Sequence, residues 1–358
     1  MTPFKFGTIV ENDFFTDRIK ELEEVKRRLD SENHLVIISP RRYGKSSLLN
    51  KALTQLGRPS ITIDFMKVLS TEDLAAQILK AIFRIYKMEK IKHLMTHFRI
   101  NPAISYNPVT EVWGVKFNPS MSDSVTELED AMELLQKVTA TDNRLIVVLD
   151  EFQEVESIDK NLAKVLRSIM QRQSGLNYVF MGSQESMMDE IFEHKKSPFY
   201  HFGQRMNLRK VPYDDFLKFI VERLPESVID KSREEIASEI LAFTGCHPYY
   251  TQQLSATVYT IMKYDKYTQD VVKDSIAEIV REHDLDYERL WQTFNRTDMK
   301  TLTILAEGEN PQTDRSIAYS TASSALKRLQ KQGHVIREKE YRIEDPFFGV
   351  WIRGKRNM

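Results

Sequence analysis

The chain has 358 residues, of which 41% are hydrophobic and 29% are charged, and its 51 Lys and Arg residues against 52 Asp and Glu residues give a net charge of −1. This length suggests two or three domains, and the balanced charge excludes a protein that is strongly basic overall, although a local basic face stays open. The single cysteine, Cys246, excludes an internal disulfide and any metal site built from several cysteines.

No signal peptide or membrane span is evident in the sequence. The first 12 residues lack the apolar stretch of a signal peptide, and no apolar run approaches the length that crosses a bilayer. We therefore expect a cytoplasmic protein without a membrane partner.

Strands and helices alternate over the first two hundred residues, which predicts a parallel α/β sheet. Short apolar runs predict buried strands at residues 35–38, 61–65, 144–151 and 178–181. Apolar residues at helical spacing predict helices at residues 16–29, 46–56, 71–88, 125–139 and 161–172. Thr16 and Thr71 are expected to cap two of these helices. Two alternating stretches within residues 100–117 flank Asn107 and Pro108 and predict a β-hairpin insertion.

The first predicted strand leads into a loop that is typical of phosphate binding. Residues 39–46 read SPRRYGKS, which is the Walker A pattern with a serine in place of the usual first glycine. In such loops the backbone N–H groups surround the phosphates, Lys45 reaches the β- and γ-phosphate oxygens, and the Ser46 hydroxyl holds Mg²⁺. The N-terminus of the following helix favours the same anion. Arg42 could contact phosphate, although pairing with nearby acids suits both Arg41 and Arg42.

The strand predicted at residues 144–151 ends in two acids, Asp150 and Glu151. We expect this strand to lie beside the loop strand and to bring both carboxylates to the phosphate end of the sheet, where ligands of open α/β sheets bind. Asp150 would hold the Mg²⁺ shell, and Glu151 would orient or deprotonate the attacking water. The alternative is a strand that ends in exposed acids by chance, which is less frequent about a hundred residues after a Walker A loop.

Two further polar residues are candidates for the same site. Ser183 ends the next strand beside Gly182, which lets the backbone turn tightly, and its hydroxyl could contact the γ-phosphate or the attacking water. Arg205 could complete the transition-state site, in cis or across a subunit interface of an oligomer. A turn serine and a solvated arginine are the respective alternatives. The residues predicted to take part in catalysis are Lys45, Asp150, Glu151, Ser183 and Arg205.

After about residue 206 the strand signal fades, and the rest of the chain is predicted to be mainly helical. Helices are expected within residues 213–263, broken near 225 and at 245–248, and over 298–305 and 320–332. Residues 335–343 alternate and predict a two-stranded wing. Two helices followed by a wing are the outline of a winged helix-turn-helix. Its second helix carries three basic residues that suit either DNA contact or a solvated face, namely Lys327, Arg328 and Lys331.

Together these motifs resemble the archaeal-type ATPase family, in the STAND branch of the AAA+ proteins. FTDR at residues 15–18 resembles the opening motif of the family, and the loop resembles its Walker A variant with serine. LDEFQ at 149–153 resembles its Walker B segment, and residues 181–183 resemble its sensor-1 turn. The other segments that carry the resemblance are residues 198–205, 244–250 and 344–351.

The resemblance implies an AAA+-like P-loop NTPase fold in three domains. These are an ATPase domain over residues 1–206 with the hairpin insertion near 100–117, a helical lid over 207–285 and a winged-helix domain over 286–358. It also implies ATP or ADP as ligand, Mg²⁺ as cofactor with Ser46 and Asp150 as its ligands, and Pro248 packed against the base. The residues expected to bind the nucleotide are Arg18, Ser39, Pro40, Arg41, Arg42, Tyr43, Gly44, Lys45, Ser46, Ser47 and Pro248.

The function predicted is an ATP-binding molecular switch that hydrolyses ATP slowly and regulates an unknown protein partner through domain rearrangement. One alternative is a DNA-associated AAA+ ATPase whose winged helix binds duplex DNA. Another is a nucleotide-binding interaction module without catalysis, against which the intact pair of Asp150 and Glu151 argues. The sequence leaves the oligomeric state and the partner open.

Overall fold

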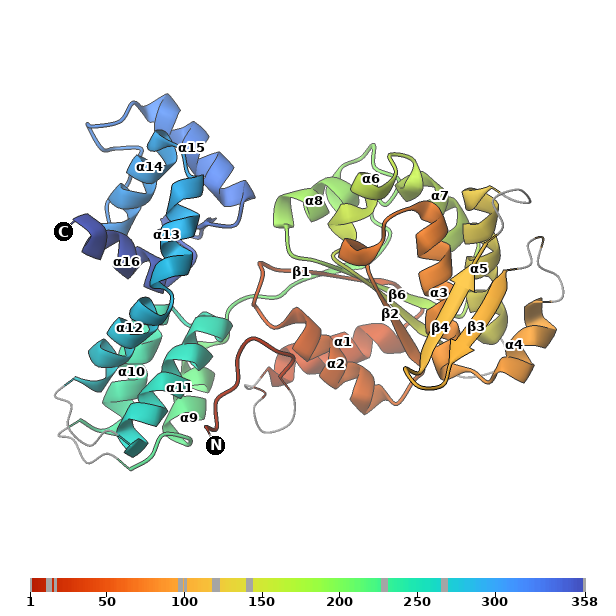
Figure 1. Ribbon diagram of the computed structural model, residues 1–358, viewed down its shortest axis with the longest axis horizontal. Coiled ribbons are helices and arrows are strands. Elements are labelled where there is room, and N and C mark those ends of the chain that lie inside the picture. Colours follow the sequence, from red (N-terminus) through yellow and green to blue (C-terminus); the bar gives the residue numbers. More distant parts are fainter. Residues whose placement is uncertain are drawn as a thin grey trace. The chain divides into compact units, whose positions relative to one another are not determined.

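A computed structural model gives the architecture of the chain (Figure 1) and describes residues 2–10, 15, 18–95, 99, 102–117, 123–139, 144–226, 231–264 and 270–356. The chain forms two compact units. We call the first the sheet unit, and it consists of Ile19–Pro40 and Leu48–Leu208. We call the second the lid unit, and it consists of Met1–Arg18, Arg41–Ser47 and Arg209–Met358.

In the part of the chain that the structure describes, the sheet unit is built on five parallel strands in the order β2-β5-β6-β1-β7. Their bounds are β1 (Leu35–Ile38), β2 (Ser60–Asp64), β5 (Ile146–Asp150), β6 (Asn177–Gly182) and β7 (Gln204–Asn207). All residues of β1 and β6 are buried, as expected for inner strands of a parallel sheet that has helices on both faces. All five carboxyl ends therefore lie at one edge of the sheet.

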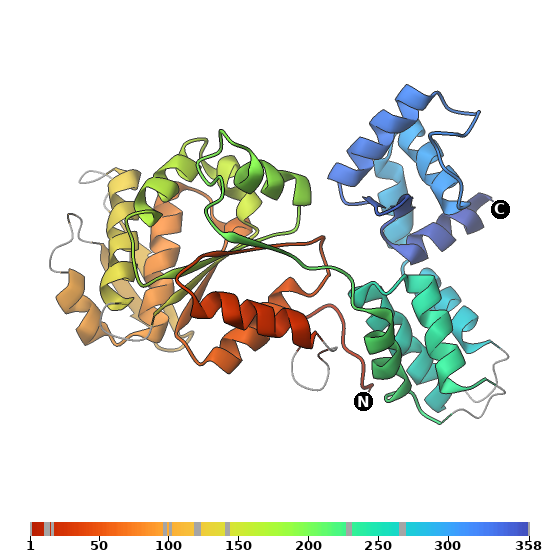
Figure 2. The same ribbon diagram turned by 180° about the vertical axis from the view of Figure 1, so that it is seen from behind.

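Helices lie on both sides of this sheet, as both views show (Figures 1 and 2). They are α1 (Ile19–Asp30), α2 (Lys45–Leu56), α3 (Thr71–Ile85), α4 (Met88–Leu94), α5 (Ser124–Thr139), α6 (Val155–Ile158), α7 (Leu162–Met170) and α8 (Glu185–Glu193). An antiparallel hairpin of β3 (Ala103–Asn107) and β4 (Val112–Lys116) packs against α3, which confirms the predicted hairpin insertion. Ile100 and Asn101, the first residues of that prediction, lie outside the described residues.

The core of the sheet unit centres on a cluster of aromatic rings. Phe152 lies with its ring centroid 4.8 Å from that of Phe180 and 5.2 Å from that of Phe199. All three side chains are fully buried. Because Phe152 and Phe180 lie next to the carboxyl ends of β5 and β6, this packing fixes the strand ends that carry the candidate site.

The lid unit has its own hydrophobic core. Its helices are α9 (Tyr213–Val221), α10 (Arg233–Thr244), α11 (Pro248–Tyr264), α12 (Val271–Glu282), α13 (Asp284–Thr293), α14 (Arg296–Ala306), α15 (Tyr319–Lys331) and α16 (Pro346–Arg356). A two-stranded hairpin of β8 (Val335–Arg337) and β9 (Tyr341–Ile343) follows α15. The predicted order of two helices and a hairpin is present, and the winged-helix assignment and the three domain boundaries stay predictions. No helix in the described part of the chain combines the length and apolarity that crossing a membrane requires.

Two expectations about the sheet unit were wrong. β5 does not lie beside the loop strand β1, because β6 pairs with both and separates them. Thr71 does not cap α3, because the side chain of Ser70 accepts the hydrogen bond from the Asp73 backbone N–H. The predicted cap at Thr16 lies outside the described residues. The sequence pattern also missed β7 and α8, whose polar or short segments carry little periodic signal.

Candidate nucleotide site

The loop between β1 and α2 has the backbone of an anion-binding nest. Arg42 and Gly44 are left-handed, with φ of +64° and +87°, whereas Tyr43 between them is not. Alternation of this kind directs successive backbone N–H groups to one point and forms an anion-binding concavity. Glycine adopts this conformation freely, whereas a residue with a side chain does so at a cost of about 1–2 kcal/mol. Gly44 therefore fits its position, and Arg42 is held in a conformation that its own side chain disfavours.

Ser39 shows why the loop tolerates a serine at the usual glycine position. Its φ is not in the left-handed region, so its backbone does not require glycine. The Ser39 N–H donates to the carbonyl of Gly182 (3.4 Å), which joins the ends of β1 and β6. Ser39 is fully buried, and Pro40, which follows it, is half-buried.

The first turn of α2 contains the three residues predicted to follow the glycine of the loop. Lys45 and Ser47 are buried, and Ser46 is half-buried. The Ser47 hydroxyl accepts a hydrogen bond from the backbone N–H of Val10 (2.9 Å). Ser47 therefore ties the N-terminal segment to the loop, and its expected contact with the nucleotide stays a prediction.

Arg18 and the start of α11, which belong to the same unit as the loop, both contact the loop. Arg18 is buried, and its Nη2 donates to the carbonyls of Tyr43 (3.0 Å) and Arg209 (2.9 Å). The Tyr43 ring lies edge-on to the His247 ring, with centroids 4.9 Å apart. Pro248 begins α11 directly after this histidine and is half-buried. The structure thus brings Arg18, Tyr43 and the start of α11 together, and the expected contacts with a nucleotide base stay predictions.

At the carboxyl edge of the sheet, the predicted acids and Ser183 meet. Asp150 is the last residue of β5, and its Oδ1 accepts from the N–H of Glu151 (3.0 Å). Glu151 is left-handed, with φ of +51°. Its Oε2 accepts hydrogen bonds from the Ser183 hydroxyl (2.6 Å) and from Nε2 of Gln153 (2.6 Å). Two donors therefore hold the Glu151 carboxylate in one orientation.

Gln153 and Gly182 are parts of this arrangement to which the sequence gave no separate role. Gln153 is buried (1% exposed), and burial without a partner is costly for an amide, so the bond to Glu151 gives its Nε2 group a partner. A Cβ at Gly182 would lie 2.4 Å from the Met188 side chain and 2.7 Å from Oε1 of Gln153. Glycine is thus required here by close packing of the network. The signal that could have found Gln153 is its place two residues after Glu151.

Arg205 is not part of this group of residues. It lies on β7, and its Nη1 is 2.8 Å from Asp189 and 3.6 Å from Glu193, both on α8. Its Nε donates to Oδ1 of Asn207 (2.8 Å). These contacts fasten α8 to the edge strand, and a catalytic role for Arg205 stays a prediction.

A Walker A loop implies Mg²⁺, and the available side-chain oxygens suit that ion. Among the described residues, no group of three or more His, Cys, Asp or Glu side chains could form a metal site made of protein alone. Mg²⁺ typically keeps several waters and binds one or two protein oxygens together with the phosphates of its nucleotide. The Ser46 hydroxyl at the start of α2 and the Asp150 carboxylate at the end of β5 are donors of that kind.

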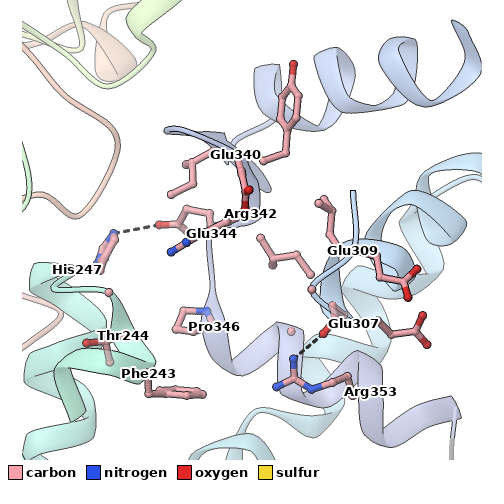
Figure 3. Close-up of a pocket in the computed structure, with 18 of the residues that line it drawn as sticks. Phe243, Thr244, His247, Glu307, Glu309, Glu340, Arg342, Glu344, Pro346 and Arg353 are labelled. Carbon is pink, nitrogen blue, oxygen red and sulfur yellow. Dashed lines mark hydrogen bonds and ion pairs between the residues drawn. The ribbon is translucent and has the colours of Figure 1, made fainter. Parts of the chain in front are cut away.

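A cavity of about 640 Å³ lies within the lid unit, between the α10–α11 turn and the C-terminal segment (Figure 3). Glu344 and His247 point toward one another at its edge, with Glu344 Oε1 3.2 Å from His247 Nε2. Both acidic and basic side chains line the cavity, among them Lys210, Glu307, Arg342 and Arg353. This mixture favours no ligand of a single charge.

Comparisons with known proteins agree with this geometry. Residues 15–254, which are more than half of the chain, match the model of an ATPase domain found predominantly in Archaea. No protein of curated function matches the sequence.

Solved structures share the fold over nearly the whole chain. The Walker-type ATPase PABY2304 of Pyrococcus abyssi matches with a TM-score of 0.66 and 17% identity, over 96% of this chain and 97% of that one. The ORC2 protein of Aeropyrum pernix, in its ADPNP–ADP complexes, matches with a TM-score of 0.53 and 13% identity, over 99% of this chain and 100% of that one. The ORC1 protein of the same organism, in complex with DNA, matches with a TM-score of 0.50 and 12% identity, over 96% and 93%. The sheet order, the phosphate loop and the matching family model agree, and the chain belongs to the family of ATPase domains found predominantly in Archaea.

Proposed function

We propose that this chain is a STAND-type molecular switch that binds MgATP, hydrolyses it slowly and regulates a protein partner through a change in domain arrangement. The observation that carries the proposal is the Glu151 carboxylate, which Ser183 and Gln153 hold at the carboxyl edge of the sheet. A protein that only retained nucleotide would have no need for an oriented acid at this position.

Different residues of the chain bind the phosphates, activate the water and hold the metal ion. The loop N–H groups and Lys45 bind the phosphates and neutralise charge that develops on them. Glu151 orients the attacking water and accepts its proton at the carboxylate. Ser183 and Gln153 donate hydrogen bonds to that carboxylate and hold it in one orientation. Ser46 and Asp150 would hold Mg²⁺, which would supply positive charge to offset part of the phosphate charge.

The test is Glu151→Gln, with Glu156→Gln as a matched control on an exposed glutamate of α6. We expect Glu151→Gln to bind ATP with unchanged affinity and to release phosphate at least about a hundredfold more slowly, because general-base catalysis contributes about 10²–10⁴-fold. Glu156→Gln should match the wild type in both assays. Equal turnover of the Glu151 variant and the wild type would reject the role of Glu151. Tight nucleotide retention without phosphate release by the wild type would instead support a module without catalysis.

A second candidate is a DNA-associated ATPase, which the fold shared with the DNA-bound ORC1 protein favours. In α15 of this chain, Lys327 and Lys331 are exposed. Arg328 forms two hydrogen bonds to Asp298, so it holds α15 against α14 and is a weaker candidate for phosphate contact. Duplex DNA binding that strengthens at low salt and is lost in Lys327→Gln/Lys331→Gln would support this function. Equal binding by the double variant would count against it.

A further inference from the structure

Arg42 needs an explanation that the phosphate loop itself does not supply. Its left-handed backbone, with φ of +64°, is unfavourable for a residue with a side chain. The left-handed conformations of Arg42 and Gly44, with Tyr43 between them not left-handed, form the anion-binding nest. Contacts of the Arg42 side chain must therefore stabilise the loop in its binding-competent form.

Those contacts come from two adjacent tyrosines at the start of α11. The Arg42 guanidinium lies over the Tyr249 ring, 4.5 Å from its centroid, which is within the range of a cation–π interaction. Its Nη1 also donates a hydrogen bond to the Tyr250 hydroxyl (3.3 Å). The side chain is thus held both by a ring face and by a hydroxyl oxygen.

The Tyr250 hydroxyl, which accepts from Arg42, also forms a hydrogen bond to a carboxylate. It donates to Oε2 of Glu344 over 2.6 Å. Burial raises the pKa of the Tyr250 hydroxyl above its usual value, and the negative charges of Asp345 and Glu344 add to the shift, so the hydroxyl keeps its proton. Arg42 and Tyr250 are therefore successive donors in a chain of two hydrogen bonds that ends on the Glu344 carboxylate, and such chains strengthen each bond in them.

Glu344 is in turn fixed by the C-terminal segment. It follows β9 directly, and its backbone N–H donates to the carbonyl of His334 (3.0 Å). The next residue, Asp345, accepts from the N–H of Phe347 (2.9 Å) and so caps α16. His247 faces the other Glu344 oxygen (Figure 3). Burial lowers the pKa of His247, against the opposing effect of Glu344, so the imidazole is neutral at pH 7. The neutral ring does not compensate the negative charge of Glu344, which therefore acts on the Tyr250 hydroxyl and on Arg42.

We propose that Tyr250 and Glu344 are positioning residues of the phosphate loop, which hold Arg42 in the left-handed conformation that completes the anion-binding nest. Through them, nucleotide affinity depends on the docking of the C-terminal segment that contains Glu344 and α16. By thermodynamic reciprocity, bound nucleotide also strengthens that docking. The inference rests on the proposed function, because it assigns a control device to the same nucleotide site.

The test compares the affinity for a fluorescent ATP analogue in Tyr250→Phe, which removes the hydroxyl and keeps the ring, and in Tyr259→Phe, on the same helix, as the matched control. We expect Tyr250→Phe to raise Kd and KM by about fivefold or more while kcat changes little, because coupling energies between sites commonly reach this size. The ring of Tyr259 packs against Phe4, and Tyr259→Phe should bind like the wild type. Glu344→Gln should weaken binding in the same direction, with Glu340→Gln in the same hairpin as its control.

A rescue experiment separates positioning from a general loss of stability. Glycine adopts the left-handed conformation without support, so in an Arg42→Gly background Tyr250→Phe should change Kd by less than about twofold. Loss of affinity that persists in the Arg42→Gly background, or equal Kd in Tyr250→Phe and Tyr259→Phe, would overturn the inference. Wild-type protein that binds ATP without hydrolysing it would reject the catalytic part of the proposed function and leave this inference standing. Wild-type protein that does not bind the analogue would reject both.

Discussion

The Ser183 hydroxyl donates a hydrogen bond of 2.6 Å to Oε2 of Glu151 and so connects the ends of β6 and β5. Glu151 is left-handed, so its side chain does not continue the direction set by the strand. The orientation of its carboxylate therefore depends on Ser183 and on Gln153, which bonds the same oxygen. In this structure Ser183 bonds to the acid itself, and its predicted contact with phosphate or water stays a prediction.

The first prediction concerns Ser183→Ala, which removes one of the two donors to Glu151. Hydrogen bonds to charged groups are worth about 1.5–3 kcal/mol, so we expect kcat to fall about ten- to hundredfold. The affinity for ATP should stay the same, because the loop is unchanged. Ser186→Ala, on the exposed face of α8, is the control. A steady-state ATPase assay in which both variants match the wild type would contradict the role of Ser183.

A second prediction is that Gly182→Ala destabilises the sheet unit. The added Cβ would lie 2.4 Å from Met188 and 2.7 Å from Oε1 of Gln153, so the side chains behind Glu151 must shift. Overpacking of this kind costs about 1–3 kcal/mol, and we expect kcat to fall as well. Gly354→Ala in α16 meets no atom within 4 Å and should be neutral or slightly stabilising. Urea unfolding of the two variants measures the difference, and equal midpoints would show that the site relaxes freely.

Much of the sheet unit could be predicted because its elements carry strong local signals. The strand β1 reads LVII and the middle of β6 reads YVFM, and these runs revealed both strands in the sequence. The order of the strands could not be read in this way. It depends on long-range pairing, and the insertion of β6 between β1 and β5 has no signature in either segment. The strand β7, which reads QRMN, is too polar and too short for its pattern to reveal it.

The candidate site also contains residues that local sequence patterns reveal and residues that only long-range packing brings together. Lys45, Ser46, Asp150 and Glu151 stand at fixed spacings from apolar strands, and such motifs are visible in the sequence. The contacts of Arg42 with Tyr250, and of Tyr250 with Glu344, join residues that are 208 and 94 positions apart in the chain. No local pattern could predict them, because only the packing of the lid unit brings these residues together.

A third prediction concerns Arg328, which the sequence offered as a DNA contact. Asp298 is buried, and it accepts from Nε (3.0 Å) and Nη2 of Arg328 and from Nδ2 of Asn295 (2.8 Å). Arg328→Gln should therefore lower the stability of the lid unit by about 1–2 kcal/mol, a moderate value because the arginine is partly exposed. Lys327→Gln, on an exposed neighbour, should have no effect. Thermal unfolding of both variants is the measurement, and identical curves would show that the pair contributes nothing.

A fourth prediction follows from His34, which lies just before β1. Its Nδ1 accepts from the N–H of Tyr178 (3.3 Å), and its ring packs against Phe202 with centroids 4.6 Å apart. Burial, with a smaller contribution from the positive charge of Arg167, lowers the pKa of His34 from 6.5 to about 4. The fold thus favours the neutral imidazole. The stability that His34 contributes is complete above pH 6.5 and is lost as the pH falls toward 4.

The size of that loss follows from the shift in pKa, which corresponds to about 3 kcal/mol across this range. We expect His34→Gln to be less stable than the wild type at pH 7.5, because it loses the ring contacts, but to lose less stability on acidification. His194→Gln, on an exposed histidine, should keep the wild-type dependence on pH. Urea unfolding between pH 7.5 and 4.5, followed by circular dichroism, gives the free energy of unfolding of each variant. Parallel curves for His34→Gln and the wild type would mean that a charged imidazole is tolerated beside Arg167, contrary to the burial seen at this position.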